Sequence, residues 1–161
     1  MYRQYLYVSS TSDAVRAYAD RLAQQVVGRK QLGKDHWVLE LGSNDGLILQ
    51  AFKQRGVRVL GVEPAQNIAA VARKNGIPTV AEFFCERTAR SLVGEVGKAS
   101  VILGRHVFAH IDDLHDFMQA VERLLHPEGT LLIEVPYLGT LISDLEFDTL
   151  YHEHLSYLSL A

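Results

Sequence analysis

HWVLELGSNDG (residues 36–46) joins a short apolar run to a turn that contains two glycines. The run has the length and composition of a buried strand, and residues 47–54 after the turn follow helical spacing. Gly42 and Gly46 permit a tight turn and a close approach of the backbone to a ligand. The first N–H groups of the following helix would face that ligand. This stretch therefore predicts a strand, a ligand-binding turn and a helix in succession.

The same alternation of apolar runs and helical patterns continues on both sides of this stretch. Ser12 and Asp13 are favourable N-cap residues for a first helix over residues 13–27, which Gly28 is suited to end. Alternating strands and helices form parallel sheets covered on both faces, so we predict an α/β fold with a doubly wound, Rossmann-like sheet. Such sheets bind ligands at the carboxyl ends of their strands. The predicted strands are 36–41, 57–62, 78–80, 100–103 and 130–135, and the later helices are 47–54, 65–74, 86–93 and 112–125.

Composition narrows the class of protein. The 161 residues are 48% apolar and 22% charged, as in ordinary globular domains, and the net charge of −3 gives no reason to expect binding to nucleic acid. No apolar run approaches the roughly 18 residues needed to span a membrane, and the N-terminus lacks the apolar core of a signal peptide. The single cysteine, Cys85, excludes an intramolecular disulfide. We expect a cytoplasmic protein that binds neither nucleic acid nor a membrane.

The turns after the first two predicted strands carry the pattern of a nucleotide-cofactor site. Glu63, followed by Pro64, ends the second strand, where a carboxylate accepts hydrogen bonds from both hydroxyls of a ribose. The same charge would repel the 2′-phosphate of NADP. The nicotinamide pattern G-x-G-x-x-G is not met, although an ordinary turn with two glycines remains an alternative. The stretch with Glu40, Gly42, Asn44 and Gly46 resembles the acidic residue and alternating glycines of Rossmann-like methyltransferases, with Asn44 in place of the middle glycine.

Aromatic residues and histidines gather in the remaining turns. Phe83 and Phe84 follow the third strand, where they would wall an adenine or pack in the core. His106 and Phe108 follow the fourth strand, and we expect them to line the cofactor site. His106 and His110 have the spacing of zinc ligands on a helix, but Val107 stands where metalloproteases carry glutamate, and we predict no metal. Near the C-terminus, the YHEH stretch of residues 151–154 offers several proton donors and acceptors, or a polar surface turn.

Several of these segments together resemble the sugar C-methyltransferases that act on nucleotide-linked deoxysugars. The resemblance extends from about residue 5 to the last residue, and its last motif is highly specific. It departs at His106, where the family pattern predicts asparagine before Val-Phe-Ala-His. The segments that carry it are ELGSNDG (40–46), VLGVEPAQNIA (59–69), NGIPT (75–79), VFAHIDDLHDF (107–117), IEVPYL (133–138) and EFDTLYHEHLSYLSL (146–160).

The resemblance implies how the chain relates to a larger protein. Family members have a cysteine-rich zinc module, a central S-adenosylmethionine domain and a C-terminal domain. We expect this chain to hold only the central part, with a leading segment and helix over residues 1–30 and the cofactor-binding domain over residues 31–161. Its class I methyltransferase sheet would then be cut short on the C-terminal side. An apolar surface around Leu158 and Leu160 would favour self-association, and the isolated chain should bind cofactor with little or no turnover.

The resemblance also implies a reaction and its residues. S-adenosylmethionine would methylate a sugar carbon next to a ketone on a nucleotide-linked deoxysugar, leaving S-adenosylhomocysteine. Removal of a proton from that carbon needs a base, and the resulting enolate needs hydrogen-bond donors. We assign His154 as the base, Glu153 as its orienting partner and Tyr151 as the hydroxyl that contacts the enolate or the sugar. The alternatives are a non-catalytic cofactor-binding fragment and a fragment of an NAD-dependent oxidoreductase.

Overall fold

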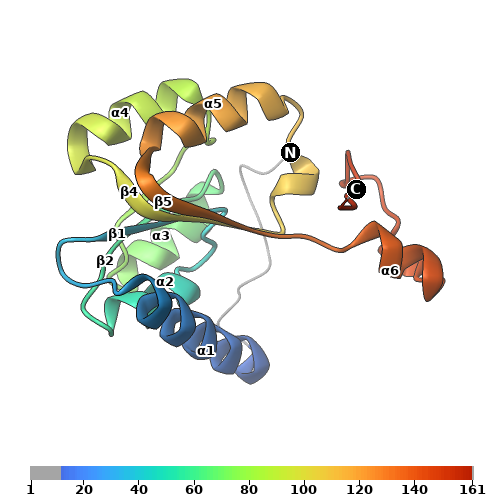
Figure 1. Ribbon diagram of the computed structural model, residues 1–161, viewed down its shortest axis with the longest axis horizontal. Coiled ribbons are helices and arrows are strands. Elements are labelled where there is room, and N and C mark those ends of the chain that lie inside the picture. Colours follow the sequence, from blue (N-terminus) through green and yellow to red (C-terminus); the bar gives the residue numbers. More distant parts are fainter. Residues whose placement is uncertain (1–11, 161) are drawn as a thin grey trace.

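The computed structural model describes residues 12–160 and contains a five-stranded parallel sheet in the order β3-β2-β1-β4-β5 (Figure 1). The predicted α/β class and doubly wound sheet are confirmed. The strand order reverses between β1 and β4, which creates the crevice where such sheets bind ligands. The tyrosines at positions 2, 5 and 7, whose alternation predicts an extended segment, lie outside the described residues. The strands are β1 (Trp37–Leu41), β2 (Arg58–Val62), β3 (Thr79–Val80), β4 (Ala99–Arg105) and β5 (Leu125–Glu134).

Helices cover both faces of the sheet because successive side chains of each strand point to opposite faces. In β1, Val38 packs with α1 and α2, whereas Leu39 packs with α4 and α5. Figure 1 shows these two helical layers on opposite sides of the strands. None of the helices between residues 12 and 160 is long and apolar enough to cross a membrane. The helices are α1 (Asp13–Lys30), α2 (Leu47–Lys53), α3 (Gln66–Lys74), α4 (Glu86–Val96), α5 (Leu114–Leu124) and α6 (Leu138–Ser143).

Several element boundaries differ from those predicted, and the differences at α1 and β5 have a clear structural cause. Helix α1 continues through Gly28 and ends at Lys30, because Gln31 takes the left-handed conformation (φ 51°) and donates its backbone N–H to the carbonyl of Val27. Strand β5 begins at residue 125 instead of 130, and a register shift against β4 accommodates the additional residues, which include Pro127. Gly28 favours the end of a helix and Pro127 disfavours a strand, but packing of the helix and pairing of the strand outweigh these local preferences.

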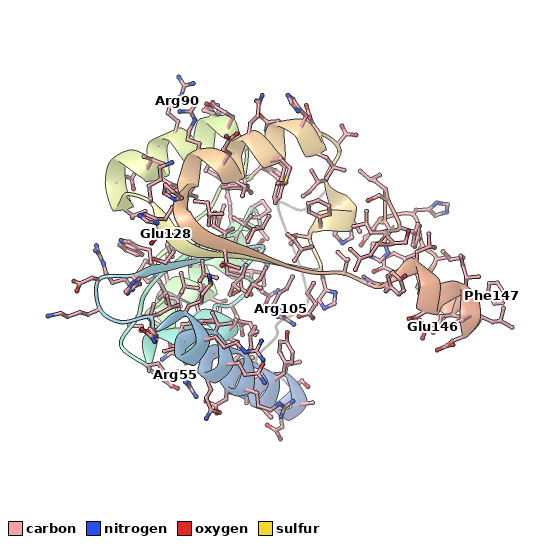
Figure 2. The ribbon with its side chains drawn as sticks, in the orientation of Figure 1. Arg55, Arg90, Arg105, Glu128, Glu146 and Phe147 are labelled. Carbon is pink, nitrogen blue, oxygen red and sulfur yellow. The ribbon has the colours of Figure 1, made fainter. Side chains whose placement is uncertain are left out.

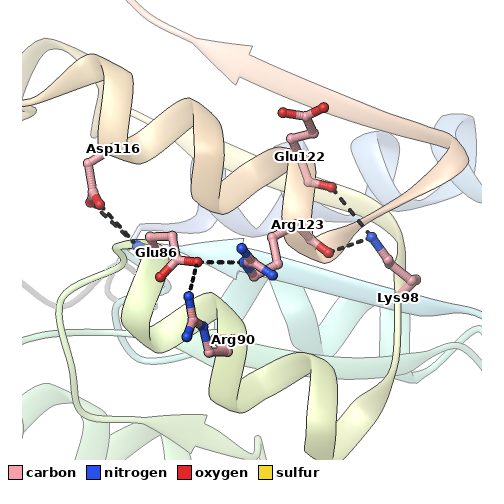
Figure 3. A network of polar contacts seen from close by, with 6 residues as sticks. All are labelled: Glu86, Arg90, Lys98, Asp116, Glu122 and Arg123. Atoms are coloured by element: carbon pink, nitrogen blue, oxygen red, sulfur yellow. Dashed lines mark hydrogen bonds and ion pairs between the residues drawn. The ribbon is translucent and has the colours of Figure 1, made fainter.

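A polar network joins the outer faces of α4 and α5 (Figure 3). The Glu86 carboxylate pairs with Arg123 at 2.7 Å and with Arg90 at 3.0 Å. Lys98 donates to the backbone carbonyl of Arg123 at 2.6 Å. Solvent reaches these pairs, so they contribute little to stability. The network aligns the two helices that form one wall of the core.

The segment after β5 extends away from the sheet and carries α6 and the short helix η3 (Phe147–Thr149) (Figure 1). Figure 2 shows Glu146 and Phe147 at its far end, and the Phe147 residue is 69% exposed. A hydrogen bond from Leu138 N–H to the carbonyl of Leu158 closes the segment on itself, and one from Leu155 N–H to the carbonyl of Ala109 joins it to the rest of the domain, both at 2.8 Å. Leu160 is 89% exposed. Self-association through this end remains a prediction.

We expect Gly46→Ala to destabilise the fold. Gly46 has φ +82°, and an added Cβ would lie 2.8 Å from Cγ1 and 2.9 Å from Cβ of Ile77, which is buried. Left-handed backbone and overpacking together should cost about 2–4 kcal/mol in the free energy of unfolding. Urea denaturation measures this loss. The matched control is Gly28→Ala, where nothing lies within 4 Å of the added carbon and a helix gains propensity. Equal stability of the two variants would contradict the prediction.

Candidate functional site

A cavity of about 310 Å³ opens at the carboxyl ends of β1, β2 and β4, next to the reversal of strand order. Its volume lies at the lower end of the range for small-molecule sites. The predicted residues Gly46, Glu40 and Phe108 do not line it. Seven of the residues predicted to bind a cofactor do line it: Gly42, Asn44, Glu63, Pro64, Phe83, Phe84 and His106.

Glu63 is fixed at the end of β2 with its carboxylate at the cavity. Oε2 accepts the backbone N–H of Asn44 and Oε1 accepts that of Ala65, both at 2.9 Å. Burial raises the pKa of Glu63, while these two hydrogen bonds oppose the rise. Each carboxylate oxygen keeps a further lone pair, so the group can accept hydrogen bonds from a diol without moving.

The turn between β1 and α2 brings backbone close to the cavity. Gly42 has φ +64°, and an added Cβ would collide with Cγ1 of Val107. Asn44 has φ +49°. Asparagine adopts this left-handed conformation more readily than other non-glycine residues, which explains how it replaces the middle glycine of the pattern. The turn therefore needs residues that tolerate left-handed backbone at positions 42 and 44, and position 42 has no room for a side chain.

Glu40 lies beneath this turn and is 3% exposed. Burial raises its pKa to about 8, and the nearby charges of Asp45 and Glu63 add to the rise while Arg105 opposes it. Within the described part of the chain, Glu40 Oε2 has no hydrogen-bond partner. A buried carboxyl with an unsatisfied oxygen at the base of a binding turn is available to respond to a bound ligand.

The aromatic wall of the cavity differs in part from the predicted one. Phe84 stacks edge-on against Phe117, with ring centroids 5.4 Å apart, and both residues line the cavity. Phe108 instead packs behind Phe117 at 5.6 Å, in the core. Phe117 lies on α5, and its spacing in that amphipathic helix marks it as a core residue, so no sequence signal set it apart as a cavity residue. Phe83 is 48% exposed at the rim.

His110 lines the cavity, whereas Tyr151, Glu153 and His154 do not. His110 lies in the short helix η2 (Phe108–His110), and its Nδ1 donates to the backbone carbonyl of Glu153 at 2.6 Å. The ring centroids of His110 and His154 are 4.9 Å apart, and those of Tyr151 and His154 are 4.1 Å apart. The three predicted catalytic residues thus lie together, joined to the cavity through His110.

His106 and Arg105, at the end of β4, face the carboxylate of Glu134 at the end of β5. Arg105 Nε lies 3.0 Å from Glu134 Oε2, and His106 Nε2 lies 2.9 Å from Glu134 Oε1. Tyr18 of α1 donates its hydroxyl to the same carboxylate. Figure 2 shows Arg105 between the sheet and α1. Residues 106–110 do not form one helix, and residues 12–160 contain no group of three or more possible ligands placed to hold a metal ion.

Comparison with known proteins gives three kinds of match. The family described as "Methyltransferase domain" matches residues 11–161. The C-methyltransferase NovU of Streptomyces niveus is 39% identical over 160 residues, which are 99% of this chain and 38% of NovU. A ubiquinone biosynthesis O-methyltransferase of Bartonella tribocorum is 28% identical over 60% of this chain and 39% of that protein. The chain therefore spans less than half the length of these relatives.

Solved structures share the fold. An S-adenosylmethionine-dependent methyltransferase from Archaeoglobus fulgidus superposes with a TM-score of 0.68 at 17% identity, covering 88% of this chain and 63% of that one. The CcbJ methyltransferase of Streptomyces caelestis gives 0.58 at 26% identity, covering 71% and 47%. The predicted class I fold and its cofactor, S-adenosylmethionine, agree with these matches. Because the family match covers nearly the whole chain, the protein belongs to the methyltransferase domain family.

Proposed function

We propose that this chain binds S-adenosylmethionine in the cavity at the ends of β1, β2 and β4 and serves C-methylation. The observation that carries the proposal is the Glu63 carboxylate, fixed by two backbone N–H groups at the cavity. Its remaining lone pairs fit the two hydroxyls of a ribose. Phe83 and Phe84 offer a wall for the adenine, with Pro64 beside Glu63. Glu40, beneath the glycine turn, has a carboxyl oxygen without a hydrogen-bond partner among the described residues. When ionised, this carboxyl would stabilise the cationic amino group of a bound S-adenosylmethionine.

The acceptor in this proposal is a carbon next to a ketone on a nucleotide-linked deoxysugar. The similarity to a protein named a C-methyltransferase supports carbon as the atom methylated. A ketone acidifies the neighbouring C–H bond, so a side chain of ordinary basicity can remove the proton. The electron pair then moves onto the carbonyl oxygen as an enolate. When bound, S-adenosylmethionine supplies a methyl group on a positively charged sulfur, from which the carbon–carbon bond can form.

Residues of the 151–154 segment supply the proton transfer in the proposed reaction. His154 removes the proton, and Glu153 orients or polarises the His154 ring. The Tyr151 hydroxyl contacts the enolate or the sugar. The contact between the rings of Tyr151 and His154, which are tilted by 39°, and the hydrogen bond from His110 to the Glu153 carbonyl support their acting as one group. Closure of the segment after β5 over a bound acceptor would bring these three residues to the cavity. His110, which contacts them, already lines it.

Replacing Glu63 with alanine tests the proposed cofactor site. We expect Glu63→Ala to weaken binding of S-adenosylhomocysteine by about 1–3 kcal/mol, because two hydroxyls of the ligand lose a charged acceptor on entering the cavity. Isothermal titration calorimetry measures the change. The matched control is Glu122→Ala, whose side chain is exposed on the outer face of α5. Identical titration curves for Glu63→Ala and the wild type would remove Glu63 from the site.

The acceptor class is tested separately with the full-length protein. Methyl-labelled S-adenosylmethionine is incubated with thymidine-diphosphate-linked keto-deoxyhexoses and, in parallel, with the matching hexoses that carry a hydroxyl in place of the ketone. We expect a new carbon–carbon bond in the keto compounds alone. Label on an oxygen of the hydroxyl compounds would instead assign the chain to O-methylation.

A further inference from the structure

Three residues from two parts of the chain, α1 and the end of β4, surround one carboxylate beside the cavity. Glu134, the last residue of β5, accepts hydrogen bonds from the hydroxyl of Tyr18, from Nε of Arg105 at 3.0 Å and from Nη2 of Arg105 at 3.2 Å, and its Oε1 lies 2.9 Å from Nε2 of His106. Burial alone would raise the pKa of Glu134, but the hydrogen bonds from Arg105 and Tyr18 outweigh it and lower the pKa. The carboxylate is therefore ionised at neutral pH and can only accept hydrogen bonds.

This arrangement fixes the hydrogen on the His106 ring. Because an ionised carboxylate only accepts hydrogen bonds, we infer that the Nε2 atom that faces it carries a hydrogen. The backbone is held as well, since the His106 N–H donates to the Glu134 carbonyl at 2.8 Å. His106 has φ +53°, a conformation that costs a non-glycine residue on the order of 1 kcal/mol and persists only where contacts enforce it.

The position of His106 separates it from the proposed cofactor contacts. Gly42 and Glu63 lie at the ends of β1 and β2, whereas His106 lines the same cavity from the end of β4, across the reversal of strand order. Its side chain is 60% exposed, so a ligand can reach it. A cofactor bound over the ends of β1 and β2 would therefore leave the end of β4, where His106 lies, for the molecule that accepts its methyl group.

We propose that His106 contacts the methyl acceptor, donating a hydrogen bond from Nδ1 to the carbonyl oxygen, and that Glu134 is the positioning residue that fixes the ring. This proposal rests on the proposed function. As the base removes the carbon-bound proton, the electron pair moves to that oxygen, and a charged imidazole stabilises the developing negative charge. The other charged or titratable groups around His106 are Tyr18 on α1, Glu40 on β1, Glu63 after β2, Arg105 on β4 and His110 on η2.

The ring state of His106 is measured without any turnover. Nitrogen-15 NMR of the chain saturated with S-adenosylhomocysteine reports which ring nitrogen carries the hydrogen. We expect the neutral ring to carry its hydrogen on Nε2, which faces the Glu134 carboxylate. In Glu134→Gln the neutral ring should populate both tautomers. A neutral wild-type ring with its hydrogen on Nδ1 would overturn the proposal.

The contact with the acceptor is measured by exchange of its acidic proton with deuterated water in the absence of methyl donor. The probe is a thymidine-diphosphate-linked keto-deoxyhexose with the full-length protein. His106→Ala should slow exchange by about 10²–10³-fold, as expected for loss of one oxyanion donor. His106→Asn keeps an amide donor, so it should recover part of the rate.

Controls keep the outcomes distinct. His115→Asn makes the same change on the exposed face of α5 and should leave exchange unchanged. Binding of S-adenosylhomocysteine verifies that each variant is folded. Exchange at the wild-type rate in folded His106→Ala would overturn the role of His106 and leave the proposed function standing. A wild-type protein that exchanges none of the keto-sugar probes, although it binds S-adenosylhomocysteine, would contradict the proposed function itself.

Discussion

His154→Asn lowers the rate of methyl transfer by about 10²–10⁴-fold, the range expected when a positioned general base is lost. Asparagine keeps much of the volume and polarity of the ring but cannot take up a proton. The rate is measured with the full-length protein under single-turnover conditions, so that product release does not hide the change. Deuterium exchange into the acceptor without methyl donor should fall by a similar factor, because it uses the same base.

Binding of S-adenosylhomocysteine should hardly change in this variant, since the proposed cofactor contacts lie on the turns after β1, β2 and β3. His126→Asn is the matched control, because His126 is exposed near the start of β5 and is absent from the cavity lining. Exchange that persists at the wild-type rate in His154→Asn would show that another residue is the base. Tyr151, whose ring lies 4.1 Å from that of His154, would then be the first residue to test.

Glu40→Gln should remove a large pH dependence of stability. Burial raises the pKa of Glu40 from 4.5 to about 8, so the folded chain holds a proton on this carboxyl that the unfolded chain releases above pH 4.5. The stabilising contribution is complete below the unfolded pKa and is lost as pH rises through about 8. The glutamine variant carries no charge at any of these pH values. It should therefore be more stable than the wild type by about 3–5 kcal/mol at pH 9 and similar to it at pH 4.5.

Urea denaturation of both proteins across this pH range gives the difference directly, because the titration of all other groups cancels in the comparison. Glu128→Gln, at an exposed position near the start of β5, should show no such difference. A wild type that keeps the same stability relative to Glu40→Gln from pH 4.5 to 9 would contradict a raised pKa at Glu40.

Local residue preferences made much of the fold and the cofactor side of the site predictable. Gly42 and Asn44 have left-handed backbone that few residue types allow, and Glu63 ends an apolar strand with a carboxylate. Each of these features acts within a few residues of the chain, so the sequence alone exposes it. The same holds for the alternation of strands and helices, which determines the parallel sheet.

The acceptor side of the site depends on contacts between distant residues. Tyr18 and Glu134 are 116 positions apart, and no periodicity in the sequence links them. His110 and Glu153 are 43 positions apart, and their hydrogen bond depends on how the segment after β5 folds back. Phe117 packs in the core, as its helical spacing predicts, yet one side of it also lines the cavity, while Phe108 packs against it at 5.6 Å. Such pairings follow from packing, which sequence patterns do not encode locally.

Calorimetric titration of the chain with S-adenosylhomocysteine and, separately, with NAD tests the central claim most directly. Both ligands carry an adenosine, so the two titrations compare the remainder of each molecule against the same adenosine contacts. We predict saturable binding of S-adenosylhomocysteine at one site per chain, weakened in Glu63→Ala, and no comparable binding of NAD. Saturable binding of NAD without binding of S-adenosylhomocysteine would contradict the account.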